Sequence, residues 1–275
     1  MKLVVYADSP HRARPVSAWA RTLLKLGPGE VVIPLVRDPS EMEETAADLI
    51  RGELRGEAGA RVALERGDGE RPEEAILQAA SRLGADVAVV SPAERRGLAR
   101  LLRGSMVARV VGGASCSVLV VKEGEIPPRR ILACVSGSRR SLTNVRAAAR
   151  LGVALDAEVT IVMVLSQLPV GHEREEEPHD SFLKSDHPLA VHVRTAEELL
   201  RRLGARGGVR VRKGLVVDEI LDEMEVPGHD LMVLGTHRAE DYDPMYEDLT
   251  SELVGRTARS ALVIGVPELP LGAGL

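Results

Sequence analysis

Four histidines fall within 21 residues of the second half of the chain, in a stretch that also carries many carboxylates. They are His172, His179, His187 and His192. Imidazole and carboxylate groups together suit a divalent transition metal. None of these histidines stands four residues from another on one helix face, and an acidic run of this kind is typical of a solvated loop. The sequence therefore predicts an exposed loop here and no metal site.

Other polar groups lie just beyond an apolar run, where a parallel sheet binds its ligands. His237 comes two residues after Gly235 at the end of such a run, so both are candidate ligand contacts. Tyr242 and Tyr246 follow in an acidic stretch. We interpret the tyrosines as packing residues, with contact to an uncharged ligand or a protein partner as the alternative. The sequence shows no Ser-His-Asp or Cys-His set in surroundings typical of a nucleophilic enzyme.

The elements that must position these groups form an internal repeat. Each half of the chain contains five short apolar runs separated by segments of helical period. The runs lie at 3–7, 31–36, 61–64, 87–90 and 118–121, then at 131–135, 159–164, 209–211, 231–234 and 261–266. The local sequence repeats as well, since Gly-Ala-Asp-Val-Ala-Val-Val at 84–90 is matched by Gly-His-Asp-Leu-Met-Val-Leu at 228–234. The pattern predicts an α/β fold of two tandem, doubly wound parallel sheets of five strands each, flanked by helices.

The boundary between the two copies falls in a short charged segment that contains Gly124, Pro127 and Pro128. The predicted domains are 1–124 and 125–275, a size at which each copy can bury its own core. Aromatic residues make up only 2% of the chain, so the cores must consist of aliphatic side chains and alanine. That composition favours parallel sheets covered by helices.

Several classes of protein are excluded by composition. The apolar runs are too short to cross a bilayer, and the N-terminus lacks the pattern of a signal peptide. The cysteines, Cys116 and Cys134, have no CxxC spacing, and no basic patch is interleaved with aromatic residues. We therefore expect a cytoplasmic protein with no nucleic-acid partner, no membrane insertion and no disulfide framework.

The first half begins with a short predicted strand that ends in an aspartate, Leu-Val-Val-Tyr-Ala-Asp-Ser at 3–9. It closes with Gly104 and Ser105, a helical segment and Ser-Cys-Ser-Val-Leu-Val-Val at 115–121. In both features it resembles the universal stress protein family. Members of that family begin with a strand that ends in an aspartate, and they close with the pattern Gly-x2-Gly-x9-Gly-Ser, a helix and a Cys-Pro-Val-Leu-Val-Val strand. The resemblance covers nearly the whole chain, twice over, and implies a fold like that of the adenine nucleotide alpha hydrolases.

The resemblance also implies a set of ligand contacts in the first copy. In nucleotide-binding members, the aspartate and a backbone group at the end of the second strand hold adenine and ribose, which here implies Asp8 and Val36. Gly104 and Ser105 would meet the phosphate of ATP or AMP. The physical reason is that glycine lets the backbone approach the phosphates, while the amides of a helix N-terminus and a hydroxyl group donate to them.

The chain departs from the family pattern in both copies. In the first copy, the first two glycines of the motif are replaced by Ser91 and Glu94. Ser91 remains a candidate ligand contact, whereas the glutamate adds a carboxylate where phosphate charge belongs. The second copy keeps Gly235, but Ser136 stands in place of the adenine-contacting aspartate. Asp248 and Leu249 replace its Gly-Ser pair. If the chain binds a nucleotide, the sequence therefore predicts that the site lies in the first copy. It predicts that the second copy has lost the ability to bind a triphosphate.

The segment Ser-Gly-Ser-Arg-Arg-Ser at 136–141 also resembles the pyrophosphatase loop of adenylating enzymes, but it lacks the second glycine and the aspartate of that loop. We interpret it as a turn in which Ser138 caps the following helix. The expected function is a stress-response protein with a regulatory adenine nucleotide. The alternatives are a regulatory module with vestigial pockets and, less favoured, an ATP-hydrolysing or adenylating enzyme. The resemblance further implies that the copies pair through their last strands, 118–121 and 261–266, and it is compatible with a homodimer.

Overall fold

The computed structural model describes residues 1–57, 59–92, 105–122, 124–165, 183–225, 228–235 and 244–265. The chain divides into two compact units, Met1–Pro127 with Thr236–Leu275 (unit 1) and Pro128–Gly235 (unit 2). The last helix and strand of the second repeat therefore belong to unit 1. The division into units reports spatial contacts and the repeat reports sequence, so the boundary at residue 124 stays a prediction about the repeat.

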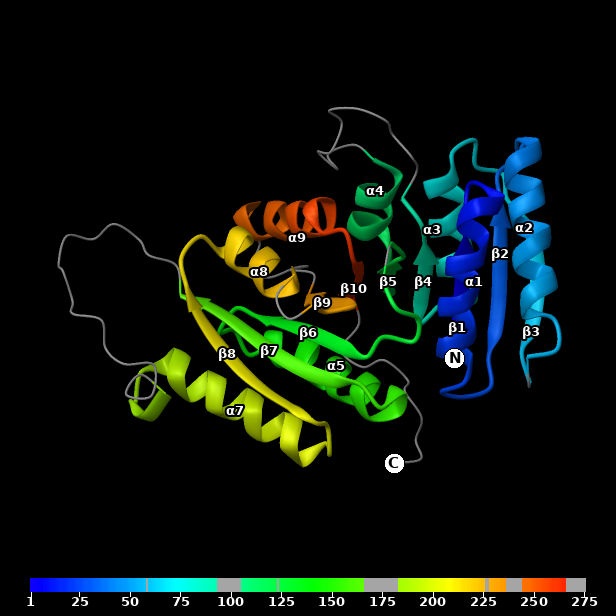
Figure 1. The fold of residues 1–275 in the computed structure, drawn as a ribbon. Helices are drawn as coiled ribbons and strands as arrows, with labels where there is room; N and C mark the ends of the chain where they lie inside the picture. The colour runs from blue at the N-terminus through cyan, green and yellow to red at the C-terminus, as the bar shows by residue number, and fades with distance from the viewer. Residues whose placement is uncertain are drawn as a thin grey trace. The chain divides into compact units, whose positions relative to one another are not determined.

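Unit 1 is a sheet with helices on both faces (Figure 1). Its elements are β1 (Lys2–Tyr6), α1 (Pro10–Leu24), β2 (Glu30–Leu35), α2 (Glu41–Leu54), β3 (Arg61–Arg66), α3 (Pro72–Leu83), β4 (Val87–Val90), α4 (Met106–Gly113), β5 (Ser117–Val120), α9 (Pro244–Arg256) and β10 (Ser260–Ile264). The strand order is β3-β2-β1-β4-β5-β10, parallel except for β10. Helices α1 and α2 pack together on one face, and α3 and α4 pack together on the other.

The core of unit 1 follows from the aliphatic strands. Strands β4 and β5 are buried along their whole length, as expected for parallel strands covered on both faces. The single tryptophan, Trp19, is 1% exposed on the buried side of α1. Helix α3 ends at Gly84, which adopts the left-handed conformation (φ 59°) that glycine tolerates best, and the chain then turns directly into β4.

Strand β10 is the last strand of unit 1, and it pairs antiparallel with β5, with Leu262 opposite Leu119. This is the pairing of last strands that the resemblance implies. Beyond β5, the ammonium group of Lys122 donates to the carbonyl oxygens of Val254 (2.5 Å) and Thr257 (2.7 Å) at the end of α9. A cation is favoured at this end of a helix, although burial lowers the pKa of Lys122 to about 8.

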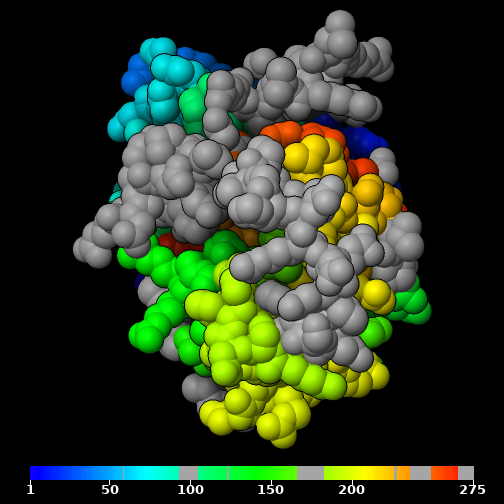
Figure 2. Space-filling view, turned by 90° about the vertical axis from the view of Figure 1, so that its left-hand side faces the viewer, coloured from blue at the N-terminus to red at the C-terminus, as the bar shows by residue number. Residues whose placement is uncertain are grey.

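Unit 2 has four parallel strands in the order β9-β6-β7-β8. Its elements are β6 (Arg130–Val135), α5 (Ser141–Leu155), β7 (Glu158–Leu165), α7 (Pro188–Arg202), β8 (Gly207–Lys213), α8 (Val216–Glu225) and β9 (Leu231–Gly235). Helix α5 packs on β6, β7 and β9, and α7 packs beside α5. Figure 2 shows the yellow-green surface of α7 next to the green surface of this part of the unit.

The predicted α/β class and all ten predicted strands are confirmed, with ends that shift by up to two residues. The prediction of an exposed loop is confirmed for His187, which is exposed and precedes α7 as its N-cap, but it is wrong for His192, which is buried within that helix. His172 and His179 lie outside the described residues. Helix α7 buries an apolar stripe that includes Ala190, Val193 and Leu200, and the acidic run before it favoured the interpretation of the whole segment as a loop. The structure places no metal-binding cluster of three or more ligand side chains within its described residues. None of the helices it describes combines the length and apolarity needed to span a membrane.

Candidate functional site

The carboxyl edge of the unit 1 sheet is a topological switch point. The chain runs from β1 outward to β2 and β3, and then returns to β4 on the other side of β1. Connections therefore diverge at the ends of β1 and β4, which is where open α/β sheets bind ligands. This edge is the candidate site, and the positions predicted from the sequence can be located on it.

Three of the predicted contacts come together at this edge. Val4 pairs with Val32, so continuing the parallel register brings Asp8 level with Val36 at the ends of β1 and β2. Tyr6 pairs with Val90, so Ser91 follows β4 at the level of the residue before Asp8. Val36 is 4% exposed and Ser91 is 5% exposed. Neighbouring strands thus present a carboxylate and a backbone segment at one level, and a small hydroxyl side chain one residue before it.

Asp8 is the part of this set that solvent reaches. Its side chain is 27% exposed, one oxygen accepts a hydrogen bond from the hydroxyl of Ser9 (3.1 Å), and the other lies 3.7 Å from the guanidinium of Arg12. Arg12 is one turn further along in α1, so the carboxylate is held by residues of its own strand-to-helix turn. A carboxylate that is oriented and partly exposed can accept hydrogen bonds from a hydroxyl-bearing ligand.

Ser105 lies at the N-terminus of α4, as the family motif requires. It is the N-cap residue, and its hydroxyl accepts a hydrogen bond from the amide of Ala108 (3.1 Å). The amides of the first turn of α4 carry partial positive charge, which suits an anion. Gly104 and Glu94 lie outside the described residues, as does His237.

Sequence reasoning missed a partly buried hydrogen bond at the same edge. Tyr6, the last residue of β1, is 2% exposed, and its hydroxyl donates to the carboxylate of Glu43 at 2.7 Å. The other oxygen of Glu43 accepts hydrogen bonds from the amide (2.9 Å) and the hydroxyl (2.8 Å) of Ser40, which form a capping box at the start of α2. The Ser-x-x-Glu spacing at 40–43 is a readable capping signal. The contact with Tyr6, 37 residues away, leaves no local signal.

The surroundings of Tyr6 are strongly acidic. Burial raises the pKa of Tyr6 well above its usual range, and the carboxylates of Glu43, Asp8 and Glu73 raise it further. Glu73 is itself 4% exposed and accepts a hydrogen bond from Arg109 in α4 at 2.5 Å. Burial opposes ionisation of Glu73, but the hydrogen bond and charge of Arg109 prevail and keep its pKa below the usual value. Tyr6 is therefore a neutral donor among negative groups.

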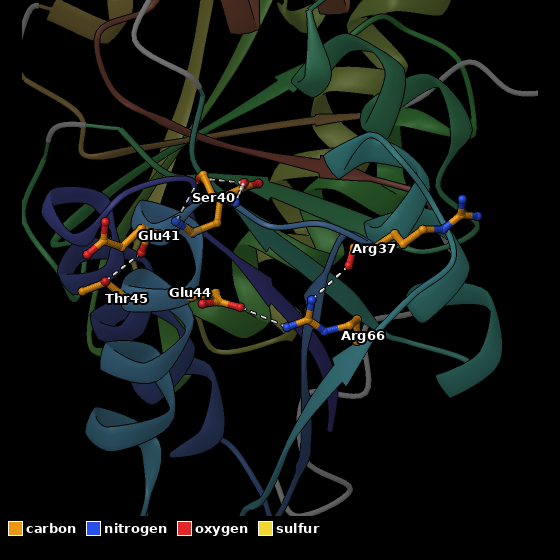
Figure 3. A network of polar contacts seen from close by, with 7 residues as sticks. Arg37, Ser40, Glu41, Glu44, Thr45 and Arg66 are labelled. Atoms are coloured by element: carbon orange, nitrogen blue, oxygen red, sulfur yellow. Dashed lines mark hydrogen bonds and ion pairs between the residues drawn. The ribbon is translucent and has the colours of Figure 1, made fainter.

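Arginines beside this edge are engaged in structural contacts (Figure 3). Arg66, at the end of β3, donates to the carbonyl of Arg37 (2.9 Å) and to the carboxylate of Glu44 (3.0 Å). Arg37, just after β2, donates to the carbonyl of Asp68 (2.8 Å). These contacts fix the ends of β2 and β3 to the start of α2, and they occupy donors that phosphate recognition would use.

The corresponding edge of unit 2 is built from neutral groups. After β6, the hydroxyls of Ser136 and Ser138 lie 3.1 Å apart, and the Ser138 hydroxyl accepts from the amide of Ser141 (3.3 Å). The prediction that Ser138 is the helix cap is wrong, because the N-cap of α5 is Arg140, whose side chain makes no capping bond. The hydroxyl of Ser141 donates to the carbonyl of Ser138 (2.7 Å) and lies 3.0 Å from Nε2 of His192. Because the single hydroxyl proton is used on the carbonyl, Nε2 must be the donor to Ser141. Burial lowers the pKa of His192 and favours this neutral ring.

Gly235 has a packing role at this edge. A Cβ at Gly235 would lie 2.9 Å from the side-chain oxygen of Asn144. Asn144 is buried and donates from its amide to the carbonyl of Cys134 at 2.9 Å. Glycine at position 235 is therefore explained by the side-chain amide of Asn144, which occupies the space that a Cβ would need.

The comparisons with known proteins agree with this architecture. The model of the universal stress protein family matches the chain twice, at residues 2–122 and 128–262. The chain belongs to the universal stress protein family. It is therefore a tandem member, with the family fold repeated along one polypeptide. No curated protein matches the sequence.

Several solved structures share the fold of this tandem universal stress protein. A universal stress protein from Archaeoglobus fulgidus is 16% identical with a TM-score of 0.67, covering 96% of this chain and 95% of that one. A putative universal stress protein from Pseudomonas aeruginosa is 14% identical with a TM-score of 0.66, covering 96% and 92%. The cytoplasmic domain of a prokaryotic cation chloride cotransporter is 14% identical with a TM-score of 0.60, covering 98% of each chain. Such identities establish the fold alone.

Proposed function

We propose that this tandem universal stress protein is a cytoplasmic regulator that binds one adenine nucleotide, ATP or AMP, at the carboxyl edge of the unit 1 sheet. The nucleotide acts as a ligand whose occupancy changes the affinity for a protein partner, without chemical turnover. Homodimerisation of the chain is part of the same proposal. Unit 2 keeps the fold of the family and binds no nucleotide.

One observation carries the proposal: the strand register brings Asp8 level with Val36, and Ser91 within one residue of that level, at the switch point. Asp8 then accepts hydrogen bonds from the adenosine moiety, and the backbone at Val36 lies beside the base. Ser105 and the first turn of α4 supply donors for a phosphate. Each residue is the one to which the family motif assigns that role.

The electrostatics of the edge favour the nucleotide with the least charge. Asp8, Glu43 and Glu73 all lie close enough to Tyr6 to raise its pKa, so negative charge accumulates beside the site. The neighbouring guanidinium groups of Arg12 and Arg109 already face Asp8 and Glu73. Each added phosphate charge meets repulsion here. We therefore expect AMP to bind more tightly than ADP, and ADP more tightly than ATP.

Binding without turnover is supported by the state of the serine–histidine contact in unit 2. Ser141 is 6% exposed, and its hydroxyl proton is directed to the carbonyl of Ser138 rather than to His192. The pair is a structural hydrogen bond at the start of α5. It does not present an activated nucleophile to solvent.

A second candidate function is a regulatory module with vestigial pockets. The contact between Tyr6 and Glu43 favours it, because this bond already satisfies both groups at the end of β1. The fold likeness to the cytoplasmic domain of a cation chloride cotransporter is consistent with such a module, in which the fold serves an assembly rather than a ligand.

Calorimetric titration of the full chain with AMP, ADP and ATP separates the two functions. The nucleotide proposal predicts saturable heat at one site per chain, in the order AMP, ADP, ATP. At about millimolar nucleotide even a weak site of about −4 kcal/mol is half-occupied, so the absence of heat at that concentration would favour the regulatory module with vestigial pockets. Release of phosphate or pyrophosphate from ATP during the titration would instead identify an enzyme.

A further inference from the structure

Helices α3 and α4 hold a buried carboxylate against an arginine beside the candidate site. Glu73 lies in the first turn of α3 and is 4% exposed. Its carboxylate accepts a hydrogen bond from Nε of Arg109, in α4, at 2.5 Å. The guanidinium of Arg71 lies 3.9 Å from the same carboxylate oxygen, and the side chain of Arg71 is 65% exposed. Of these two cations, Arg109 therefore compensates most of the buried charge of Glu73.

This ion pair lies at the carboxyl edge of the unit 1 sheet. Helix α3 follows β3 and helix α4 follows β4, so both helices begin at that edge, and they pack against each other (Figure 1). The charge of Glu73 also acts on Tyr6, the last residue of β1. The guanidinium of Arg109 is therefore held at the same edge as Ser105, the N-cap residue of α4.

Arg109 is one helical turn away from the proposed phosphate position. Its amide donates to the carbonyl of Ser105 at 3.1 Å, and four residues correspond to about 6 Å along the helix axis. Side chains of a helix incline toward its N-terminus, which here means toward Ser105. The side chain of Arg109 is 41% exposed, so a ligand can reach it. Arg109 can therefore extend to an anion beside the first turn of α4 while its backbone stays in place.

Nucleotides with one and with two phosphates differ in their need for this guanidinium. The first-turn amides of α4 and the hydroxyl of Ser105 provide neutral donors for one phosphate. A second phosphate adds charge, and a guanidinium binds phosphate oxygens best, through two parallel hydrogen bonds. Arg109 can turn to a second phosphate only by leaving the carboxylate of Glu73 buried without its main partner, which is costly.

We propose that Glu73 is the residue that determines how many phosphates the ligand carries, because it retains Arg109 as its own partner. The inference rests on the nucleotide site proposed above and goes beyond it by assigning the preference for AMP to one ion pair. With Glu73 ionised, Arg109 stays bound to α3 and the site favours AMP. With a neutral side chain at position 73, Arg109 is released to the second phosphate and the site binds ADP.

The preference is fixed at neutral pH. Burial opposes the ionisation of Glu73, but the hydrogen bond and the charge of Arg109 keep its pKa below the usual value. The carboxylate is therefore charged when the nucleotide binds. A change of preference requires substitution of Glu73 rather than a shift of pH around neutrality.

Calorimetric titration of the full chain with AMP and with ADP tests the role of Glu73. Glu73→Gln keeps an acceptor for Arg109 and removes the charge, so the ratio of ADP affinity to AMP affinity should rise at least ~10-fold over the wild type. Glu74→Gln is the matched control, because Glu74 is the next residue of α3 and pairs with Arg71 instead. The control removes the same charge and should change the ratio by less than about 2-fold.

A double variant separates release of Arg109 from simple loss of negative charge. In Glu73→Gln with Arg109→Gln, both charges of the pair are gone, so the pair is neutral as it is in the wild type. The ratio of ADP affinity to AMP affinity should therefore return to within about 3-fold of the wild-type value. A ratio that stays raised would show that Arg109 does not bind the second phosphate, and would overturn the proposal.

The remaining outcomes distinguish this inference from the nucleotide site itself. Circular dichroism checks that each variant is folded, and Glu73→Ala carries the same prediction if the glutamine variant is unstable. Binding of AMP with an unchanged ratio in both Glu73 variants would overturn the role of Glu73 and leave the nucleotide site in place. The absence of heat with either nucleotide, in the wild type and in every variant, would overturn both.

Discussion

The carboxyl edges of the two units start from the same strand pattern and end with different chemistry. In unit 1, the residues at the edge are ionised or bonded to ionised partners, namely Asp8 with Arg12, Tyr6 with Glu43, and Glu73 with Arg109. In unit 2, the edge is closed by neutral hydrogen bonds between Ser141 and His192 and from Asn144 to the backbone. A repeated fold thus preserves its strands and helices while the residues that follow each strand diverge. The unit whose edge keeps a partly exposed carboxylate is the one expected to bind a ligand.

The largest difference should appear at the positions that follow β4 and β9. Ser91 and Gly235 correspond in the repeat, but only Gly235 faces a side chain that leaves no room for a Cβ. Gly235→Ala should destabilise the chain by about 2–3 kcal/mol, since Asn144 is held by its hydrogen bond to the backbone. Ser91→Ala should cost less than about 1 kcal/mol. Urea unfolding measures both.

Asn144→Ala tests whether the side chain of Asn144 is the reason that position 235 requires glycine. If the amide of Asn144 is what excludes a Cβ, the cost of Gly235→Ala should fall to less than about 1 kcal/mol in the Asn144→Ala background. Costs that simply add in the double variant would show that Gly235 is required for another reason.

The next difference concerns Tyr6 and Cys134, which occupy the same position in β1 and β6. Tyr6→Phe removes the hydrogen bond to Glu43 and should cost about 1–2 kcal/mol of unfolding free energy, because a hydrogen bond to a carboxylate is stronger than one between neutral groups. Chemical denaturation gives the value.

A double-mutant cycle of Tyr6→Phe with Glu43→Ala should show a coupling free energy of about 1 kcal/mol. The matched pair of Cys134→Ala with Glu43→Ala should show none, since Cys134 lies in unit 2 and Glu43 lies in unit 1. Absence of coupling between Tyr6 and Glu43 would contradict the description of the unit 1 edge.

The smallest difference is a pH dependence that belongs to the neutral edge. Burial lowers the pKa of His192, so the unfolded chain binds a proton that the folded chain excludes as the pH falls below about 6.5. Stability from His192 is therefore present above that pH and is lost gradually towards acid. Denaturation at several pH values follows this loss.

His192→Gln supplies the control, because the glutamine amide can still donate to Ser141 but does not titrate. Between about pH 7.5 and 5.5, the variant should lose less stability than the wild type. His229 is also buried with a lowered pKa and contributes equally to both proteins. Parallel pH profiles for the two proteins would exclude a role for His192.

Much of the fold was readable from the sequence because it depends on local pattern. The aliphatic runs that become β4 and β9 are bounded by turns and are buried on both faces, so periodicity alone identifies them. Helix α7 was missed because acidic residues and histidines precede it, while its buried stripe is made partly of the small residues Ala190 and Ala196. Where a buried surface is made of small residues, hydropathy gives a weak signal.

The candidate site was only partly readable, because its key contacts join distant residues. The family motif led to Asp8, Val36 and Ser105, each next to an element that periodicity predicts. The bond between Tyr6 and Glu43 depends on how α2 packs against the end of β1, and the role of Gly235 depends on Asn144 of another helix. Such contacts follow from tertiary packing, which one sequence does not specify at the level of side chains.

The central claim is that the unit 1 edge binds a nucleotide and the unit 2 edge does not. Calorimetric titration of AMP into Asp8→Ala and Ser136→Ala compares the corresponding positions directly, with Asp38→Ala as an exposed acidic control on the unit 1 edge. One site per chain is expected, weakened at least ~10-fold by Asp8→Ala and unchanged by Ser136→Ala and Asp38→Ala. Equal affinity in Asp8→Ala, or weakening by Ser136→Ala, would contradict the account and place the ligand elsewhere.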